Sequence, residues 1–80
     1  MSEMSRLRWR CRRGMKELDV AMTAYLEKFY PQANADEQAA FLRLIDAQDP
    51  ELMNMVMGKI KAPDEQMQHV IQTIRRAVTA

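Results

Sequence analysis

The sequence predicts an all-α fold, a small single-domain bundle of about five short helices. Three observations lead to this class. Glycine and proline are scarce, with two and three residues in a chain of 80, while residues of high helix propensity are abundant. Apolar residues recur at helical spacing, and no segment shows the sustained alternation of a strand. Helix start and stop signals divide the chain at short intervals. We expect residues 1–80 to form one helical domain, with residues 1–4 frayed.

The first two expected helices lie in the N-terminal half of the chain. The first runs from about Ser5 to Arg12, with Ser5 as its N-cap. The second runs from about Met15 to Phe29, and Tyr30-Pro31 ends it because the residue before proline is disfavoured in the α region. Its apolar stripe consists of Leu18, Met22, Tyr25, Leu26 and Phe29.

The third and fourth expected helices begin at two different cap signals. The segment 34–37, Asn-Ala-Asp-Glu, has the form of a capping box, and the helix that follows ends near Ala47. Its inner face is expected to carry Phe41, Leu44 and Ile45. The fourth helix spans residues 50–57, with Asp49 as N-cap and Pro50 as the first helical residue. Gly58 is placed to be the left-handed residue after its end.

The fifth expected helix opens at Pro63-Asp64 and has the clearest apolar face of the chain. That face consists of Met67, Val70, Ile71, Ile74 and Val78. Arg75 and Arg76 fall toward its C-terminus, where cations are favourable. The pattern predicts a helix that packs along the core.

The net charge of +1 hides an asymmetry between the two ends of the chain. Residues 1–16 contain six bases and one acid, a net +5, and residues 17–80 contain six bases and ten acids, a net −4. A local basic segment indicates a localised partner site. One cysteine excludes an internal disulfide framework and suits a reducing compartment. With no apolar run of signal-peptide or membrane-span length, we expect a soluble cytoplasmic protein without a membrane partner, or its organellar equivalent with any transit peptide missing.

The residue inventory argues against an enzyme. One histidine and one cysteine cannot form a zinc site with the usual ligands, so no metal site is expected. His69 is interpreted as an ordinary, partly exposed helix residue, and Cys11 as a small, partly buried thiol. Gly14 and Gly58 stand alone, so there is neither a dinucleotide fingerprint nor a P-loop. We expect no catalytic residues and no cofactor bound stably by the chain itself.

Two kinds of partner remain open for the basic segment. Five arginines and Trp9 near the N-terminus are compatible with weak, salt-sensitive binding to nucleic acid. However, the only candidate recognition helix, PELMNMVMG, contains no base. A protein partner fits better, since Arg, Trp and Met are enriched in interface cores. Against this, a small bundle with a single tryptophan is expected to bury most of it.

The stretch CRRGMKELD, residues 11–19, raises a local question of stability. In a continuous helix, Arg13 and Glu17 would form a pair worth roughly 0.2–0.5 kcal/mol. Gly14 between them would cost about 1 kcal/mol. The stretch is therefore interpreted as a helix boundary, with Gly14 at positive φ after the first helix. Arg12 and Arg13 would then lie at the negative end of that helix, and Glu17 and Asp19 at the positive start of the next.

The same stretch resembles a family signature. Arg13 to Glu17 reads Arg-Gly-x-x-Glu, with Trp9 and Cys11-Arg12 upstream, Leu18-Asp19 downstream, and the segment 49–52, Asp-Pro-Glu-Leu, later in the chain. This ordered set resembles the succinate dehydrogenase assembly factor family, the flavinator proteins, which form five-helix bundles of this length. One departure is Met55, where the family commonly has tryptophan.

The resemblance implies a non-catalytic assembly factor. It would bind the flavoprotein subunit of succinate dehydrogenase, and of fumarate reductase, and promote covalent attachment of FAD to that client. FAD would be the cofactor of the client. Arg13 and Glu17 would make charge-assisted hydrogen bonds to the client while Gly14 allows close backbone approach. The expected partner-binding residues are Trp9, Arg12, Arg13, Gly14, Met15, Lys16, Glu17 and Asp19.

We expect the protein to be a monomer. Two alternatives stay beside it, a nucleic-acid-binding protein and an antitoxin-type regulator that uses the basic N-terminal segment. Nothing in these residues independently supports the antitoxin role. No nucleic acid is expected under the favoured interpretation.

Overall fold

The computed structural model describes residues 2–79 of the chain, with side chains as far as Ala77. Within these residues it is all-α, as predicted, and contains no strand. The elements are α1 (Glu3–Arg10), α2 (Lys16–Lys28), the 3₁₀ turn η1 (Tyr30–Gln32), α3 (Ala35–Ile45), α4 (Asp49–Val56) and α5 (Glu65–Thr79). No helix in this part of the chain has the length and apolar content needed to cross a membrane.

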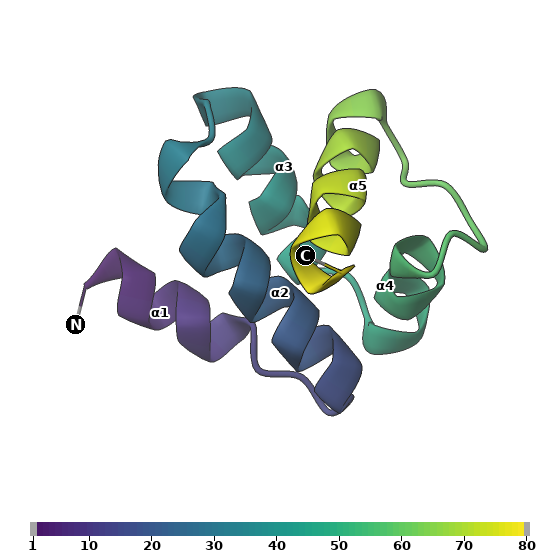
Figure 1. The fold of residues 1–80 in the computed structure, drawn as a ribbon, viewed down its shortest axis with the longest axis horizontal. Helices are drawn as coiled ribbons and strands as arrows, with labels where there is room; N and C mark the ends of the chain where they lie inside the picture. The colour runs from purple at the N-terminus through teal and green to yellow at the C-terminus, as the bar shows by residue number, and fades with distance from the viewer. Residues whose placement is uncertain (1, 80) are drawn as a thin grey trace.

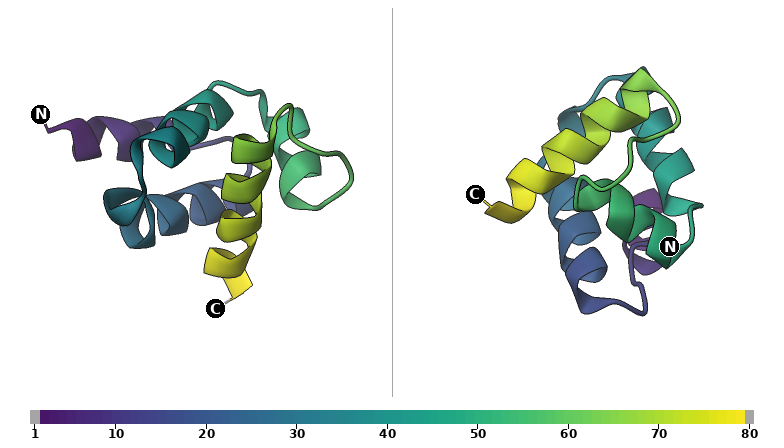
Figure 2. Two further views of the ribbon diagram at one scale, coloured as in Figure 1. Left: turned by 90° about the horizontal axis from the view of Figure 1, so that it is seen from above. Right: turned by 90° about the vertical axis from the view of Figure 1, so that its right-hand side faces the viewer.

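The last helix organises the bundle. α5 packs against α2, α3 and α4, and α1 lies along the outer side of α2 (Figure 1). The short α4 lies at the end of the bundle where α2 begins, and it contacts both α2 and α5 (Figure 2). This arrangement brings the loop between α1 and α2 close to the start of α4, although some 35 residues separate them in the sequence.

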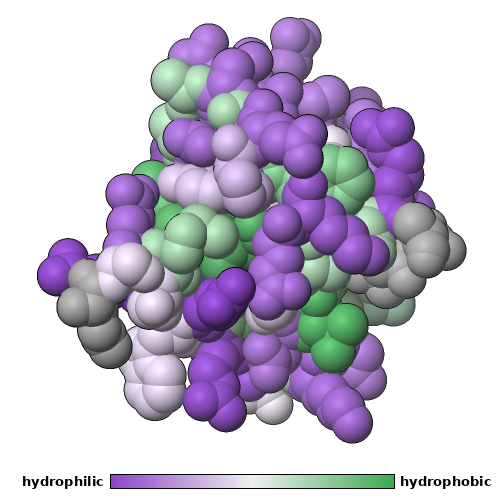
Figure 3. All heavy atoms as spheres, turned by 60° about the vertical axis from the view of Figure 1, so that its left-hand side comes forward, coloured by the Kyte–Doolittle hydropathy of each residue, from purple (hydrophilic) through white to green (hydrophobic). Residues whose placement is uncertain are grey.

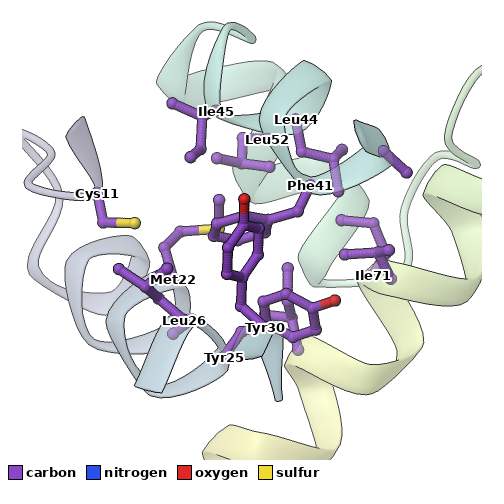
Figure 4. Packing of buried hydrophobic residues seen from close by; sticks show 14 of the residues in the cluster. Cys11, Met22, Tyr25, Leu26, Tyr30, Phe41, Leu44, Ile45, Leu52 and Ile71 are labelled. Carbon is purple, nitrogen blue, oxygen red and sulfur yellow. The ribbon is translucent and has the colours of Figure 1, made fainter. Parts of the chain in front are cut away.

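The core is built from the inner faces that the apolar spacing predicts, except that Phe29 of the predicted α2 stripe, the C-cap residue of that helix, is exposed. Figure 4 shows it as one cluster in which Tyr25 from α2 and Tyr30 from η1 meet Phe41 from α3. The ring centroids of Tyr25 and Phe41 are 4.7 Å apart, and those of Tyr30 and Phe41 are 5.5 Å apart. The predicted apolar face of α5 is buried at Met67, Val70, Ile71 and Ile74, while the side chain of Val78 lies outside the described residues.

The first helix begins earlier than expected. Ser2 is its N-cap, and the Ser2 hydroxyl accepts a hydrogen bond of 3.2 Å from the Ser5 amide, so the prediction of Ser5 as the cap is wrong. The prediction of a frayed segment is also wrong for Glu3 and Met4, which are helical, while Met1 lies outside the described residues. Burial of Leu7 and packing of Met4 against the core hold this turn in place.

The predicted cap of the third helix is confirmed. The Asn34 side chain accepts a hydrogen bond of 2.9 Å from the Glu37 amide. The Glu37 carboxylate was expected to reach back to the Asn34 amide; it lies instead 3.4 Å from Nε2 of His69 on α5. Glu37 therefore contacts His69 of another helix in place of the Asn34 amide, and only the Asn34 half of the capping box is formed.

The predicted N-cap of α4 is wrong, whereas the glycine predicted after its C-terminal end is confirmed. Gln48 is the N-cap residue, and the carboxylate of Asp49 is used elsewhere, so the prediction of Asp49 as the cap is wrong. Gly58 has φ +81° and follows the helix end, as predicted. The Lys59 amide donates to the Asn54 carbonyl at 2.8 Å, which is the long bond of a Schellman motif.

Candidate protein-binding site

The residues that carry the family signature form a turn between two helices. We call residues 13–17, Arg-Gly-Met-Lys-Glu, the Arg13–Glu17 corner; it joins the end of α1 to the first turn of α2. Within the described chain no ion pair joins Arg13 to Glu17. The stretch is a helix boundary, as expected, but its parts have different roles from those predicted.

Gly14 does not have the left-handed conformation expected of it. Gly58 is the glycine with positive φ in residues 2–79, so the prediction that Gly14 ends α1 at positive φ is wrong. The helix ends instead at Cys11, which has helical dihedral angles and donates its amide to the Leu7 carbonyl. A Cβ atom built on Gly14 would meet only the Asp49 carboxylate, at an ordinary contact distance of 3.5 Å. Neither the backbone nor internal packing therefore requires glycine at position 14.

Arg13 is directed into the protein. Its side chain is 13% exposed, and its Nη2 and Nη1 atoms donate to the carbonyl oxygens of Ile45 and Ala47, the latter at 3.2 Å. These carbonyls lie at the C-terminal end of α3, where backbone acceptors lack helical partners and cations are favoured. Arg13 was expected at the end of α1; it stabilises the end of α3 instead.

Asp49 connects Arg13 to Gly14. Its Oδ1 atom lies 3.4 Å from Nη1 of Arg13, and its Oδ2 atom accepts a hydrogen bond of 3.2 Å from the Gly14 amide. One carboxylate at the start of α4 thus holds both the base and the backbone of the corner. From the sequence, Asp49 was expected only to cap a helix, and this second role was not predicted. One feature of the sequence pointed to this contact: the segments 13–17 and 49–52 both belong to the set of motifs that resembles the family.

The outer residues of the corner face solvent. Lys16 and Glu17 are exposed in the first turn of α2, and Met15 is partly buried against the core. No ion pair holds the Glu17 carboxylate within residues 2–79, whereas Arg13 and Asp49 are paired with each other. The corner therefore consists of a buried, bonded part and an exposed part with an unpaired acid.

Trp9 lies outside the core, contrary to the expectation that a small bundle buries its single tryptophan. It is 69% exposed, with the Arg12 guanidinium 5.5 Å from the ring centroid. The reason is geometric, because Trp9 follows the buried Leu7 by two positions, or about 200° around the helix. Trp9, Arg12 and Asp19 line one shallow depression between α1 and α2.

The surface on the α1 side of the molecule is mixed. Figure 3 shows it as mainly hydrophilic, with separate hydrophobic patches. The arginines of α1 and the exposed Trp9 belong to this part of the chain. A partner that binds here would meet basic groups and one aromatic ring, which is the composition common in the centres of protein interfaces.

The remaining candidate chemical groups are structural. Cys11 is fully buried, more than expected, and burial raises the pKa of its thiol to about 11. Its sulfur points toward Met22 in the core (Figure 4). His69 is exposed beside Glu37. Across the described part of the chain, no three acidic, histidine or cysteine side chains come together as a metal site. Met55 is 2% exposed, so the departure from the family's tryptophan changes the core and not the surface.

The fold and the corner together define a small helical protein whose signature residues divide between an internal ion-pair network and an exposed turn. The chain belongs to the family described as the flavinator of succinate dehydrogenase, which matches residues 5–78. The sequence resemblance to this family is thereby confirmed.

Three curated relatives have the same name, FAD assembly factor SdhE. The protein of Pectobacterium atrosepticum is 38% identical over 71 residues, which cover 89% of this chain and 81% of the relative. That of Idiomarina loihiensis is 39% identical over 72 residues, covering 90% and 80%. That of Shewanella oneidensis is 33% identical over 75 residues, covering 94% and 92%. The similarity thus extends over nearly the whole chain, including both ends of the Arg13–Asp49 network.

Proposed function

We propose that this protein is an assembly factor that binds the flavoprotein subunit of succinate dehydrogenase and promotes covalent attachment of FAD to it. The family description and the names of the relatives support this role. The flavoprotein subunit of fumarate reductase is proposed as a second client. The protein would act as a monomer in the cytoplasm.

One observation carries the assignment of the docking site. Gly14 occupies the centre of the corner although neither its backbone conformation nor its internal contacts call for glycine. A missing side chain on an exposed turn allows another backbone to approach closely. We therefore propose that the client contacts the protein at Gly14.

The residues around Gly14 would make the other contacts with the client. Glu17, exposed and without an ion pair in the described part of the chain, would accept charge-assisted hydrogen bonds from the client. Trp9 and Arg12 would extend the contact along α1, and Met15, Lys16 and Asp19 would line its edges. Arg13 was expected to contact the client directly, but its Nη atoms are bonded to Ile45, Ala47 and Asp49. We assign it a positioning role, because it holds Gly14 through Asp49.

The proposed contribution to flavinylation is binding and orientation. FAD is the cofactor of the client, and the groups of the client form the bond. By binding the client in the conformation that brings its histidine and its flavin together, the assembly factor would raise the rate through proximity and orientation. No catalytic residue is assigned to this chain.

Reconstitution with purified components tests this proposal. The flavoprotein subunit is incubated with FAD and the wild-type protein, Gly14→Arg or Ala39→Arg, and covalent flavin is measured by fluorescence of the denatured subunit. Ala39 is exposed on α3, so it receives the same arginine away from the corner. We expect flavinylation with the wild type and with Ala39→Arg, and its loss with Gly14→Arg at unchanged helical circular dichroism.

Two results would count against parts of the proposal. Full flavinylation with Gly14→Arg would remove the corner as the docking site while leaving the assembly role in place. A wild-type protein that neither binds the subunit nor raises its flavinylation would overturn the assembly role itself.

The nucleic-acid and antitoxin alternatives gain no support. The family and the relatives are described by flavin assembly and not by nucleic-acid binding. In α4, the only candidate recognition helix, Leu52 and Met55 are buried and no base is present.

A further inference from the structure

A groove opens on the other side of the Arg13–Glu17 corner from Trp9. It has a volume of about 560 Å³ and lies between the first turns of α2, the end of α4 and the C-terminal part of α5. Its lining is almost entirely apolar and consists of Met15, Glu17, Leu18, Ala21, Met53, Val56, Met57 and Arg75. The side chains at its mouth are accessible, since Met57 is 55% exposed.

The groove is continuous with the proposed docking site. Met15 and Glu17 belong both to the corner and to the wall of the groove. A segment that crosses Gly14 therefore reaches the groove without leaving the surface of the protein. This continuity favours the client as the occupant over an unrelated ligand.

The charges of the groove indicate what the occupant carries. Glu17 stands at the wall nearest to the corner and has no ion pair within residues 2–79. Arg75, on the opposite wall, already takes part in an interaction within the chain. The charge left for a ligand is therefore the acid, and its complement is a cationic side chain.

The lining also indicates how selective the groove is. Three of its residues, Met15, Met53 and Met57, have flexible thioether side chains that adapt to irregular apolar shapes. Such a lining suits apolar side chains of more than one kind. The same groove could thus accept related but different client segments.

We propose that this groove binds an apolar side chain from a segment of the client flavoprotein that also carries a lysine or arginine, which pairs with Glu17. The proposal rests on the proposed assembly function and deepens it, because it adds a second contact beside Gly14 and states the chemistry of the client segment. The apolar side chain supplies the desolvated anchor, and the base fixes the register of the segment.

A matched pair of substitutions tests the groove. Met57→Lys places a cation at its mouth, and Val20→Lys makes the same change on α2 outside the groove, at a residue with nearly the same exposure, 53% against 55%. Met57 is the C-cap residue of α4, where a cation is compatible with the helix. We expect the Kd for the purified flavoprotein subunit to rise about tenfold with Met57→Lys and to stay within about twofold with Val20→Lys.

Two further measurements address the chemistry of the occupant. Glu17→Gln should weaken client binding and reduce its dependence on salt, because one exposed ion pair is lost. A photo-cross-linking residue at position 57 should join a client peptide that contains an apolar residue beside a lysine or arginine, as identified by mass spectrometry. Met57→Leu, which keeps the apolar volume, should retain the wild-type affinity.

The possible failures can be told apart. If the wild type binds and flavinylates the client but Met57→Lys binds as tightly as Val20→Lys, the groove proposal is wrong and the assembly function stands. Cross-links to a second copy of this chain, with self-association lost in Met57→Lys, would also overturn it. If the wild type does not bind the client at all, the proposed assembly function is wrong, and the groove proposal that rests on it is wrong as well. Circular dichroism of each variant identifies a loss of folding.

Discussion

Arg13 and Asp49 form an ion pair, with 3.4 Å between Nη1 and Oδ1, that ties the α1–α2 loop to the start of α4. Both side chains are mostly buried, with exposed fractions of 13% and 26%. The pair is extended by hydrogen bonds from Arg13 to the end of α3 and from the Gly14 amide to Asp49. One base and one acid thus join three helix ends and hold the turn on which the proposed docking site lies.

Arg13 should be important for stability as well as for function. Replacing it by glutamine removes the guanidinium from the Ile45 and Ala47 carbonyls and leaves the Asp49 carboxylate with the Gly14 amide but without its ion-pair partner. We expect Arg13→Gln to lower the free energy of unfolding by about 1–3 kcal/mol, measured by urea denaturation. Arg12→Gln is the control, since Arg12 is exposed, and it should change stability by less than about 0.5 kcal/mol. Equal stability of the two variants would contradict the conclusion that the contacts of Arg13 with Ile45, Ala47 and Asp49 stabilise the fold.

The two glycines should respond oppositely to alanine. Gly58 has φ +81°, where a Cβ atom is strained, so Gly58→Ala should destabilise the protein by about 1–2 kcal/mol. Gly14→Ala meets no such strain, and its Cβ finds an ordinary contact with Asp49. It should be neutral or stabilising by up to about 1 kcal/mol. Thermal unfolding of the two variants compares them directly, and a large loss with Gly14→Ala would restore an internal reason for that glycine.

Stability should decrease at high pH. Burial raises the pKa of Cys11 to about 11 and that of Tyr25 to about 12 in the folded protein, above the values of roughly 8.5 and 10 in an unfolded chain. Because each folded pKa is raised, the associated stability is fully present below about pH 8.5 and decreases as the pH rises through the folded values.

Cys11→Ala provides the control for this pH dependence. The variant should lose less stability than the wild type between about pH 8.5 and 11, because only the tyrosines whose pKa is raised by burial, Tyr25 and Tyr30, then contribute. Urea denaturation at several pH values measures the difference. In parallel, maleimide should label the wild-type thiol slowly at neutral pH and rapidly in denaturant. Fast labelling of the native protein would show that the thiol is not held in the core.

Trp9 should be a reporter of client binding and not of folding. Because it is 69% exposed, Trp9→Ala should change the free energy of unfolding by less than about 0.5 kcal/mol. With 5-fluorotryptophan incorporated, the protein has one ¹⁹F resonance, which should show a large solvent isotope shift when free and a smaller one on addition of unlabelled flavoprotein. Gly14→Arg should abolish this change. An unchanged resonance in a saturated wild-type complex would place Trp9 outside the contact.

The secondary structure of this protein could be predicted from local patterns. The apolar spacing identified the buried faces of α2, α3 and α5, and cap residues such as Asn34 and Gly58 marked real helix ends. These features depend on neighbours within a few positions, where sequence spacing determines spatial spacing. The N-cap of α1 was misplaced by three residues because Ser2 and Ser5 both suit an N-cap.

The sequence pointed to a candidate site, but it did not predict how that stretch is organised internally. The family signature drew attention to residues 11–19, yet the structural roles predicted for Gly14 and Asp49 were wrong, and Trp9 was expected to be buried. Each error concerns a contact that local rules do not describe. The side of α1 that faces the core, for example, follows from how that helix lies on α2 (Figure 1).

By itself, the sequence determined that the protein is a helical bundle, where its helices lie and to which family it belongs, because these follow from short-range periodicity and from an ordered motif. Only the tertiary structure decided that Arg13 points inward and that the Gly14 amide is held by Asp49. The physical reason is the distance along the chain, since the partners of these groups are 32 to 36 positions away and meet them only when α3 and α4 pack beside the corner.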